Sequence, residues 1–163
     1  MAELMWDASA LVKRYVQETG SDTVQALLSR APPHGFITTV WGYAESFSIL
    51  LRRHNAGVIS TPAFNTATAA LRNEVLAQGD VIFVAVPDTV VIGSIGLMRQ
   101  HNLNATDAAI LTAFLQYGWS RPRAIRCILV AADKRLIRAA RAEGLEALDP
   151  EAVPIERLSE DLV

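Results

Sequence analysis

Short apolar runs alternate along this chain with longer segments in which apolar positions recur at helical spacing. The clearest run, Val81 to Val86, has six apolar residues and no polar alternation, which predicts a strand covered on both faces. Further strands are expected at Leu4–Trp6, Phe36–Thr39 and Ile128–Ala131, with Leu145–Leu148 as a short fifth candidate. Helices are expected over Ser9–Val16, Ser21–Arg30, Trp41–His54, Ser60–Ala77, Asp88–Gln100, Asn104–Tyr117 and Lys134–Glu143.

Regular alternation of strands and helices favours one α/β domain. Such alternation is typical of right-handed crossovers, which place helices on both faces of a mainly parallel sheet. A length of 163 residues is that of one ordinary domain. We therefore expect a domain over residues 1–148. The acidic segment 149–163, with five acids against Arg157, either belongs to it or is a loosely held tail.

Composition narrows the classes of protein. With 51% apolar and 20% charged residues, the chain can bury a core, which argues against intrinsic disorder. The mean hydropathy of +0.23 raises the question of a membrane span. However, the longest charge-free stretch, His54–Leu71, is rich in Asn, Ser and Thr, and about 20 consecutive apolar residues are required. We therefore expect no membrane association.

Charge and cysteine content exclude two further kinds of protein. A net charge of -2 does not suit a generic polycation that coats nucleic acid. Cys127 is the only cysteine, which excludes an internal disulfide and a multi-cysteine zinc site. No apolar segment of signal-peptide length precedes Asp7, so a cytoplasmic protein without a secretion signal is expected.

Four carboxylates stand where a parallel sheet gathers its functional side chains. Asp7 directly follows the first expected strand, and Asp133 follows the fourth. Glu45 lies one turn into the helix after the second strand, and Asp107 lies in the first turn of its helix. Because the carboxyl edge of such a sheet carries the binding crevice, we expect these four acids to face one another.

A structural role for the same acids is the alternative. Asp7 and Asp133 can be N-caps, and Asp107 can be a first-turn acid favoured by the helix dipole. Glu45 is harder to explain in this way, because it lies among apolar positions on its helix and a carboxylate there needs a cation. Arg52 could pair with it, but the acids have no matching set of Lys or His residues.

Oxygen ligands of this kind suit Mg²⁺ or Mn²⁺ rather than zinc. Two such ions about 4 Å apart would activate a water molecule and stabilise the leaving oxygen in phosphodiester hydrolysis. This chemistry requires no histidine base. The three histidines, His34, His54 and His101, are accordingly expected to be structural or solvated.

These residues carry a resemblance to a known family. The segment Trp6-Asp7-Ala8-Ser9-Ala10-Leu11-Val12-Lys13 resembles the opening of PIN-domain ribonucleases, particularly the VapC type of toxin. The Glu45 helix and the segments Asn104–Ala108 and Val130–Leu136 are similar to the later acidic motifs of that family in order and spacing.

The resemblance implies a parallel five-stranded α/β/α sandwich with three layers. It also implies a metal-dependent endoribonuclease, the toxin of a toxin–antitoxin pair, which acts on RNA, binds a cognate antitoxin and forms a homodimer. Mg²⁺ or Mn²⁺ would be held by Asp7, Glu45, Asp107 and Asp133, and Ser9 matches the hydroxyl that accompanies the first acid.

Two other functions stay open. Ala131 stands where the family often has Thr or Ser, which removes a possible water-positioning hydroxyl and leaves a catalytically silent PIN-like binding module as the alternative. A haloacid-dehalogenase-like phosphatase also begins with an Asp after its first strand. That chemistry needs a second acid two residues later, where this chain has Ser9.

Residues around the acids give further expectations. Lys13, Arg14, Lys134 and Arg135 could bind the RNA backbone or be solvated. The aromatic residues Trp6, Trp41 and Phe47 could stack bases or pack in the core. A stripe on the helix after Ser60 could form a dimer face or be buried within the monomer; its members are Phe64, Ala67, Leu71 and Val75.

Overall fold

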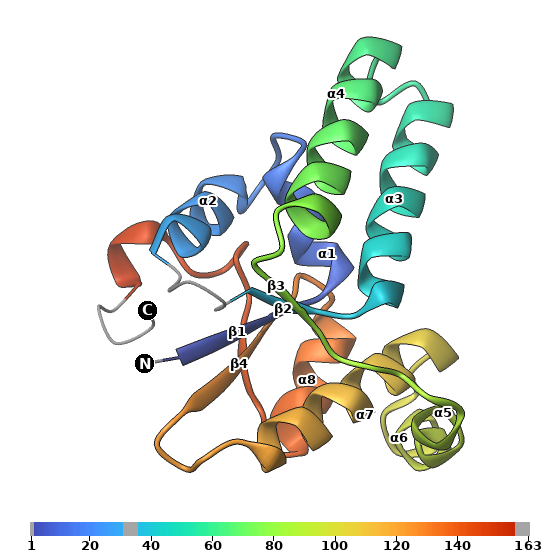
Figure 1. Cartoon of the computed structure of the whole chain (residues 1–163), viewed down its shortest axis with the longest axis vertical. Helices are drawn as coiled ribbons and strands as arrows, with labels where there is room; N and C mark the ends of the chain where they lie inside the picture. Colours follow the sequence, from blue (N-terminus) through green and yellow to red (C-terminus); the bar gives the residue numbers. More distant parts are fainter. Residues whose placement is uncertain (1, 31–35, 159–163) are drawn as a thin grey trace.

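A parallel sheet with helices on both faces forms the centre of the protein (Figure 1). The computed structural model describes residues 2–30 and 36–158, and within them the sheet has five strands in the order β3-β2-β1-β4-β5. All neighbouring strands pair in parallel, which confirms the expected three-layer α/β/α sandwich. The strands are β1 (Ala2–Trp6), β2 (Phe36–Thr38), β3 (Val81–Phe83), β4 (Arg126–Val130) and β5 (Glu146–Leu148).

Helices follow the strands, and several begin where the sequence provides a cap. The Ser60 hydroxyl accepts the N–H of Ala63, as the Ser-Thr-Pro sequence predicts, and Thr39 accepts the N–H of Gly42. The α-helices are α1 (Ala8–Leu11), α2 (Ser21–Arg30), α3 (Val40–Asn55), α4 (Thr61–Arg72), α5 (Asp88–Gly93), α6 (Ile95–His101), α7 (Ala105–Ser120) and α8 (Lys134–Ala142). Short non-α turns are η1 (Val12–Arg14), the π-helical η2 (Asn73–Ala77) and η3 (Ile155–Arg157).

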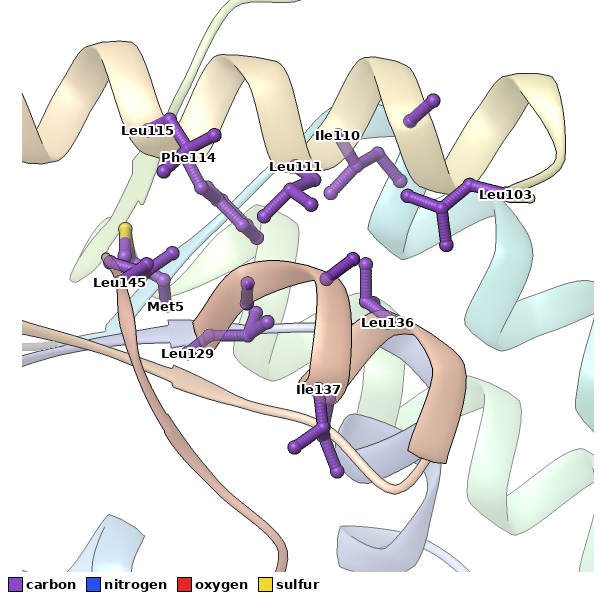
Figure 2. Packing of buried hydrophobic residues seen from close by; sticks show 14 of the residues in the cluster. Met5, Leu103, Ile110, Leu111, Phe114, Leu115, Leu129, Leu136, Ile137 and Leu145 are labelled. Atoms are coloured by element: carbon purple, nitrogen blue, oxygen red, sulfur yellow. The ribbon is translucent and has the colours of Figure 1, made fainter. Parts of the chain in front are cut away.

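The core lies on both faces of β1, whose five residues are all buried. Successive side chains of a strand point to opposite faces, so Leu4 and Met5 enter different clusters. Met5 packs with Leu129 of β4 and with residues of α7 and α8 (Figure 2). Leu4 packs with Val130 of β4 and with α2 on the other face. The first and fourth strands therefore form the buried middle of the sandwich.

The strand predicted at 81–86 forms, but it is shorter and more exposed than the predicted strand with both faces covered. The structure places β3 at the edge of the sheet, ends it at Phe83, and leaves that residue 38% exposed. Ala85 is exposed as well. The unbroken run of apolar residues predicted the strand correctly. It did not predict that the strand lies at the edge of the sheet with part of its surface exposed.

Two helical predictions also change. The segment Asp88–Gln100 forms two helices that are separated at Ser94, whose hydroxyl donates to the carbonyl of Val91 at 2.7 Å. Gly93 and Gly96 flank this point, and glycine weakens a helix. The first helix is shorter than expected, because a 3₁₀ turn replaces the α-helix after Leu11.

The apolar stripe of α4 is covered within the chain. Ala67, Leu71 and Val75 are at most 3% exposed, and they pack with Leu11 and Leu50. Figure 1 shows α4 lying alongside α3. The stripe therefore gives no support for the expected dimer face.

The described part of the acidic C-terminal segment, residues 149–158, packs on the domain. Asp149 and Leu158 are buried, and Thr23 of α2 donates its hydroxyl to the carbonyl of Val153 at 3.0 Å. Residues 159–163, like the expected position of His34, lie outside the described residues. In the described ranges, no helix combines the length and the apolar character that a bilayer crossing requires.

Candidate functional site

The sheet topology brings the ends of β1 and β4 together. From β1 the chain builds β2 and β3 on one side of the sheet and then crosses to β4 on the other side. Asp7 directly follows β1, and its backbone N–H donates to the carbonyl of Val130, the last residue of β4, at 3.0 Å. The carboxyl edge at such a switch point is where open α/β sheets place their binding sites.

Asp7 is buried at this edge, with only 5% of its surface exposed. Its Oδ2 accepts the backbone N–H of Ser9 at 2.9 Å and also the Ser9 hydroxyl, so it is the N-cap of α1. Burial raises the pKa of Asp7, the nearby Asp133 raises it further, and the hydrogen bonds from Ser9 oppose both effects. A buried carboxylate is therefore held in place by local hydrogen bonds beside a second negative charge.

Asp133 is exposed and is the N-cap of α8. Its Oδ1 accepts the backbone N–H groups of Arg135 at 2.7 Å and of Leu136 at 2.9 Å. Asp7 and Asp133 thus have the capping geometry of the structural alternative. Capping does not exclude binding, because a capping carboxylate has a further oxygen lone pair that can accept another ligand.

Ser9 joins these two acids. Its hydroxyl donates to Asp7 Oδ2 and accepts the backbone N–H of Ala132 at 2.9 Å and of Asp133 at 3.3 Å. One side chain therefore ties the segment after β1 to the segment after β4. This supports the expected role of Ser9 beside the first acid.

Glu45 extends from α3 and is only partly buried, yet its Oε2 is a buried atom without a hydrogen-bond partner among the described residues. Burial raises its pKa, and the charges of Asp7 and Asp133 raise it further. Arg52 attracts this carboxylate, but its Nη1 donates to the hydroxyl of Ser48 at 2.9 Å. An unpaired buried carboxylate oxygen is energetically costly unless a cation satisfies it.

Asp107 lies in the first turn of α7, where Asn104 orients it. Asn104 Oδ1 accepts the backbone N–H of Asp107 at 2.8 Å, and its Nδ2 donates to Asp107 Oδ2, also at 2.8 Å. The pKa of Asp107 is raised to about 7. Burial is the largest cause, the negative charges of the other three acids add to it, and the positive charge of Arg135 opposes the rise. The orienting role of Asn104 was not predicted, although its place three residues before Asp107 is the spacing of an N-cap contact.

The structure thus brings all four predicted acids into one another's electric field. The pKa of Asp107 is raised by the charges of Asp7, Glu45 and Asp133, and the causes of the raised pKa values of Asp7, Glu45 and Asp107 include no lysine or histidine. Their side chains do not form a closed cage. Among residues 2–30 and 36–158, no three His, Cys, Asp or Glu side chains are arranged to hold a metal ion together.

An open arrangement of carboxylates still suits Mg²⁺. This ion retains several water molecules and is usually bound through one or two carboxylates together with substrate phosphates. The donor chemistry and the unpartnered Glu45 oxygen both fit such an ion. The residues present are therefore compatible with a divalent cation that binds together with its substrate.

The cations around the acids divide into two kinds. Lys13 was predicted either to bind the RNA backbone or to be solvated, but it is 4% exposed and pairs with Glu18 at 3.1 Å and Glu151 at 2.7 Å, so the structure contradicts both predictions. Arg14 is half-buried and pairs with Glu74 at 3.1 Å.

Lys134 and Arg135 remain exposed at the start of α8. Lys134 pairs with Asp149 and, at 3.4 Å, with Glu151. Arg135 donates Nη1 to the carbonyl of Asn102 at 3.0 Å, and its charge reaches Asp107. Arg135 is therefore a cation beside the acids that is available to an anionic ligand.

The aromatic candidates separate in the same way. Trp6 is fully buried and packs edge to face on Phe36, with ring centroids 5.9 Å apart, so it is a core residue and not a stacking platform. Phe47 packs on Phe64, also at 5.9 Å. Trp41 is 56% exposed at the start of α3, which makes it the most exposed of these three aromatic residues.

Comparison with known proteins extends the description of the fold. No protein-family model matches the chain, and no curated protein matches it in sequence. Among solved structures, it is similar to the crystal structure of PAE2754 from Pyrobaculum aerophilum, with a TM-score of 0.59 and 16% sequence identity. The match covers 97% of this chain and 95% of that chain. At this identity the likeness shows a shared fold over nearly the whole chain.

Proposed function

We propose that this protein is a Mg²⁺- or Mn²⁺-dependent endoribonuclease that hydrolyses phosphodiester bonds of RNA. The observation that carries the proposal is the unpartnered Oε2 of Glu45, buried beside the charges of Asp7 and Asp133. Carboxylates that raise one another's pKa cluster at functional sites. A bound cation would offset the repulsion between these carboxylates and would give the Glu45 oxygen a partner.

Asp7, Glu45, Asp107 and Asp133 are the residues that would hold the metal. Such an ion would supply a nucleophilic water at neutral pH and would stabilise the charge that develops on the leaving oxygen. The side chains around the acids contribute orientation. Ser9 fixes Asp7 against the backbone of 132 and 133, and Asn104 fixes Asp107.

Arg135 contributes attraction for the substrate. Its guanidinium lies at the start of α8, close enough to Asp107 to lower the pKa of that carboxyl group. Arginine binds phosphate oxygens through two parallel hydrogen bonds. An RNA strand with a phosphate at the acids would therefore meet this side chain on the same edge of the sheet.

The resemblance to VapC-type toxins supports a cognate protein antitoxin, a cytoplasmic location and a homodimer as parts of the same proposal. An uncompensated group of acids attracts Arg or Lys as readily as it attracts metal. We therefore propose that the antitoxin inhibits by placing a cationic side chain among the four acids. A complex in which the partner stays away from these residues contradicts this.

Cleavage of single-stranded RNA tests the activity. The parent is expected to cut with Mn²⁺ or Mg²⁺ and to stop in excess EDTA. Asp7→Asn and Asp133→Asn are expected to lose cleavage with native circular dichroism, because asparagine caps a helix about as well as aspartate. Asp88→Asn, an exposed first-turn acid of α5, is the matched control and is expected to keep full activity. Full activity in EDTA, or in either of the first two variants, contradicts the proposal.

A catalytically silent RNA-binding module is the second candidate. Ala131 is fully buried in the apolar cluster beneath α7 and α8, so this position contributes packing and no hydroxyl. Saturable binding of RNA by the parent, with no cleavage at any divalent-ion concentration, distinguishes the module from the enzyme.

A further inference from the structure

A small apolar pocket lies beside the acids. Its volume is about 130 Å³, below the about 300–1,000 Å³ of sites that hold whole drug-sized ligands, so it suits one part of a larger ligand. The start of α3, the segment after β3, α5 and the first turns of α7 form its walls. The lining residues are Trp41, Val86, Val91, Ala105, Thr106, Ala109 and Ile110.

The pocket shares its helical turns with two of the four acids. Trp41 stands four residues before Glu45 in α3, so the two side chains lie on one face, about 6 Å apart along the helix axis. Thr106 precedes Asp107 in the first turn of α7. Figure 1 shows the start of α3 close to α7, which the shared lining of the pocket confirms. A ligand held at the acids would therefore reach the pocket with a neighbouring group.

The lining selects the chemistry of that group. None of the lining residues is charged, so neither a phosphate nor a cation is favoured there. Trp41 is a residue with 56% of its surface exposed, so it can present its indole to a ligand, whereas Trp6 is fully buried. Aromatic side chains stack on nucleobases of any sequence, since every base has a π-face. The Thr106 hydroxyl and the indole N–H of Trp41 are the polar side-chain groups of the lining that can add a hydrogen bond.

We infer that this pocket seats the base of a nucleotide next to the phosphate at the acids, with Trp41 as its stacking platform. The inference rests on the proposed function, because it uses the acids as the place where the RNA backbone binds. The competing occupant is a second copy of this chain, since exposed apolar residues also lie nearby on α3, α5 and α6: Val40, Ile92 and Ile95. The hollow shape and the shared turns with Glu45 and Asp107 favour the base.

Binding of a short single-stranded RNA in Ca²⁺ tests the inference apart from cleavage. Trp41→Ala is expected to weaken binding roughly 5- to 150-fold, which corresponds to the loss of one base–aromatic stack. Trp41→Phe, which keeps an aromatic face, is expected to stay near the parent. Trp119→Ala is the matched control and is expected to bind unchanged, because Trp119 is 73% exposed and lines a different pocket.

An RNA of the same length that lacks its bases identifies the contact. With this ligand, the difference between parent and Trp41→Ala is expected to disappear. Equal loss with both ligands, or no loss with either, overturns the base pocket. Light scattering in which Trp41→Ala converts a dimer to a monomer without changing RNA affinity overturns it in favour of a second copy.

Cleavage assays on the same variants separate the two proposals. Divalent-dependent cleavage whose KM is indifferent to Trp41→Ala overturns the pocket and leaves the ribonuclease standing. Base-dependent binding through Trp41 in a parent that never cleaves RNA supports the pocket and overturns the enzyme.

Discussion

Replacing Asp107 by asparagine is expected to stabilise the metal-free protein at pH 8. The ionised Asp107 destabilises the folded state, because burial and the charges of the other acids raise its pKa from 3.8 to about 7. A folded state that binds the proton more tightly than the unfolded state loses stability as pH rises between those two values. Asparagine does not ionise, and its amide oxygen can still accept the Nδ2–H of Asn104.

The rise in pKa limits the size of the effect. A shift from 3.8 to about 7 corresponds to at most about 4 kcal/mol, since one pKa unit is about 1.4 kcal/mol. Asp107 is only partly buried, and solvent screening lowers this figure, so we expect about 1–2 kcal/mol. For a chain of this size, that is about 2–8 °C in melting temperature. The gain should be full above pH 7 and vanish below about pH 4.

Thermal unfolding in EDTA at several pH values from 4 to 8 measures this gain. Asp88→Asn is the matched control, because Asp88 is an exposed first-turn acid of α5. This control should lose about 0.3–1 kcal/mol at pH 8, since the charge then favours the helix dipole. Mg²⁺ should raise the melting temperature of the parent more than that of Asp107→Asn. If Asp107→Asn is destabilised like the control, or its gain is the same at pH 4 and pH 8, the reasoning is refuted.

Three further predictions concern stability. Ser9→Ala should cost about 1–3 kcal/mol in urea unfolding, because its hydroxyl accepts a backbone N–H at 2.9 Å; an unchanged midpoint contradicts this. Arg121→Met should lower the free energy of unfolding in urea by about 2 kcal/mol, because Glu3, which is 9% exposed, then loses the guanidinium that binds both of its carboxylate oxygens. Arg99→Met, at an exposed arginine, is the control, and an equally small effect in both variants contradicts the prediction. Leu71→Ala should cost about 2–5 kcal/mol by calorimetry, since Leu71 is fully buried within the monomer, and a loss below 1 kcal/mol would show that the site is not core.

Much of the fold follows from local pattern. Apolar runs located all five strands to within a few residues, and the Ser-Thr-Pro sequence at residues 60–62 predicted the start of α4. Alternation of strands with helices predicted the parallel sheet, because a crossover helix must return the chain to the same edge. The acids of the candidate site were predictable for the same reason: Asp7 and Asp133 follow strands that end at one edge.

Other features depended on residues distant in the sequence. The run at 81–86 predicts a strand, but not its position in the sheet. In the described sheet, β3 pairs with β2 on one side and has no strand on its other side, so it is an edge strand. The division of 88–100 at Ser94, by contrast, is local: the Ser94 hydroxyl donates to the carbonyl of Val91 three residues earlier, and Gly93 and Gly96 flank it, but the apolar spacing did not show it.

Pairs of identical residues show what the sequence determined and what only the tertiary structure decided. The sequence placed Trp6 and Trp41 beside acids, and Lys13 and Lys134 near strand ends. Folding buried Trp6 completely and left Trp41 more than half exposed; it buried Lys13 between two glutamates and left Lys134 at the surface. Residue type and spacing fix the element and the face on which a side chain lies. Its exposure, its charge partners and its pKa depend on which distant segments cover that face, and chain topology decides that.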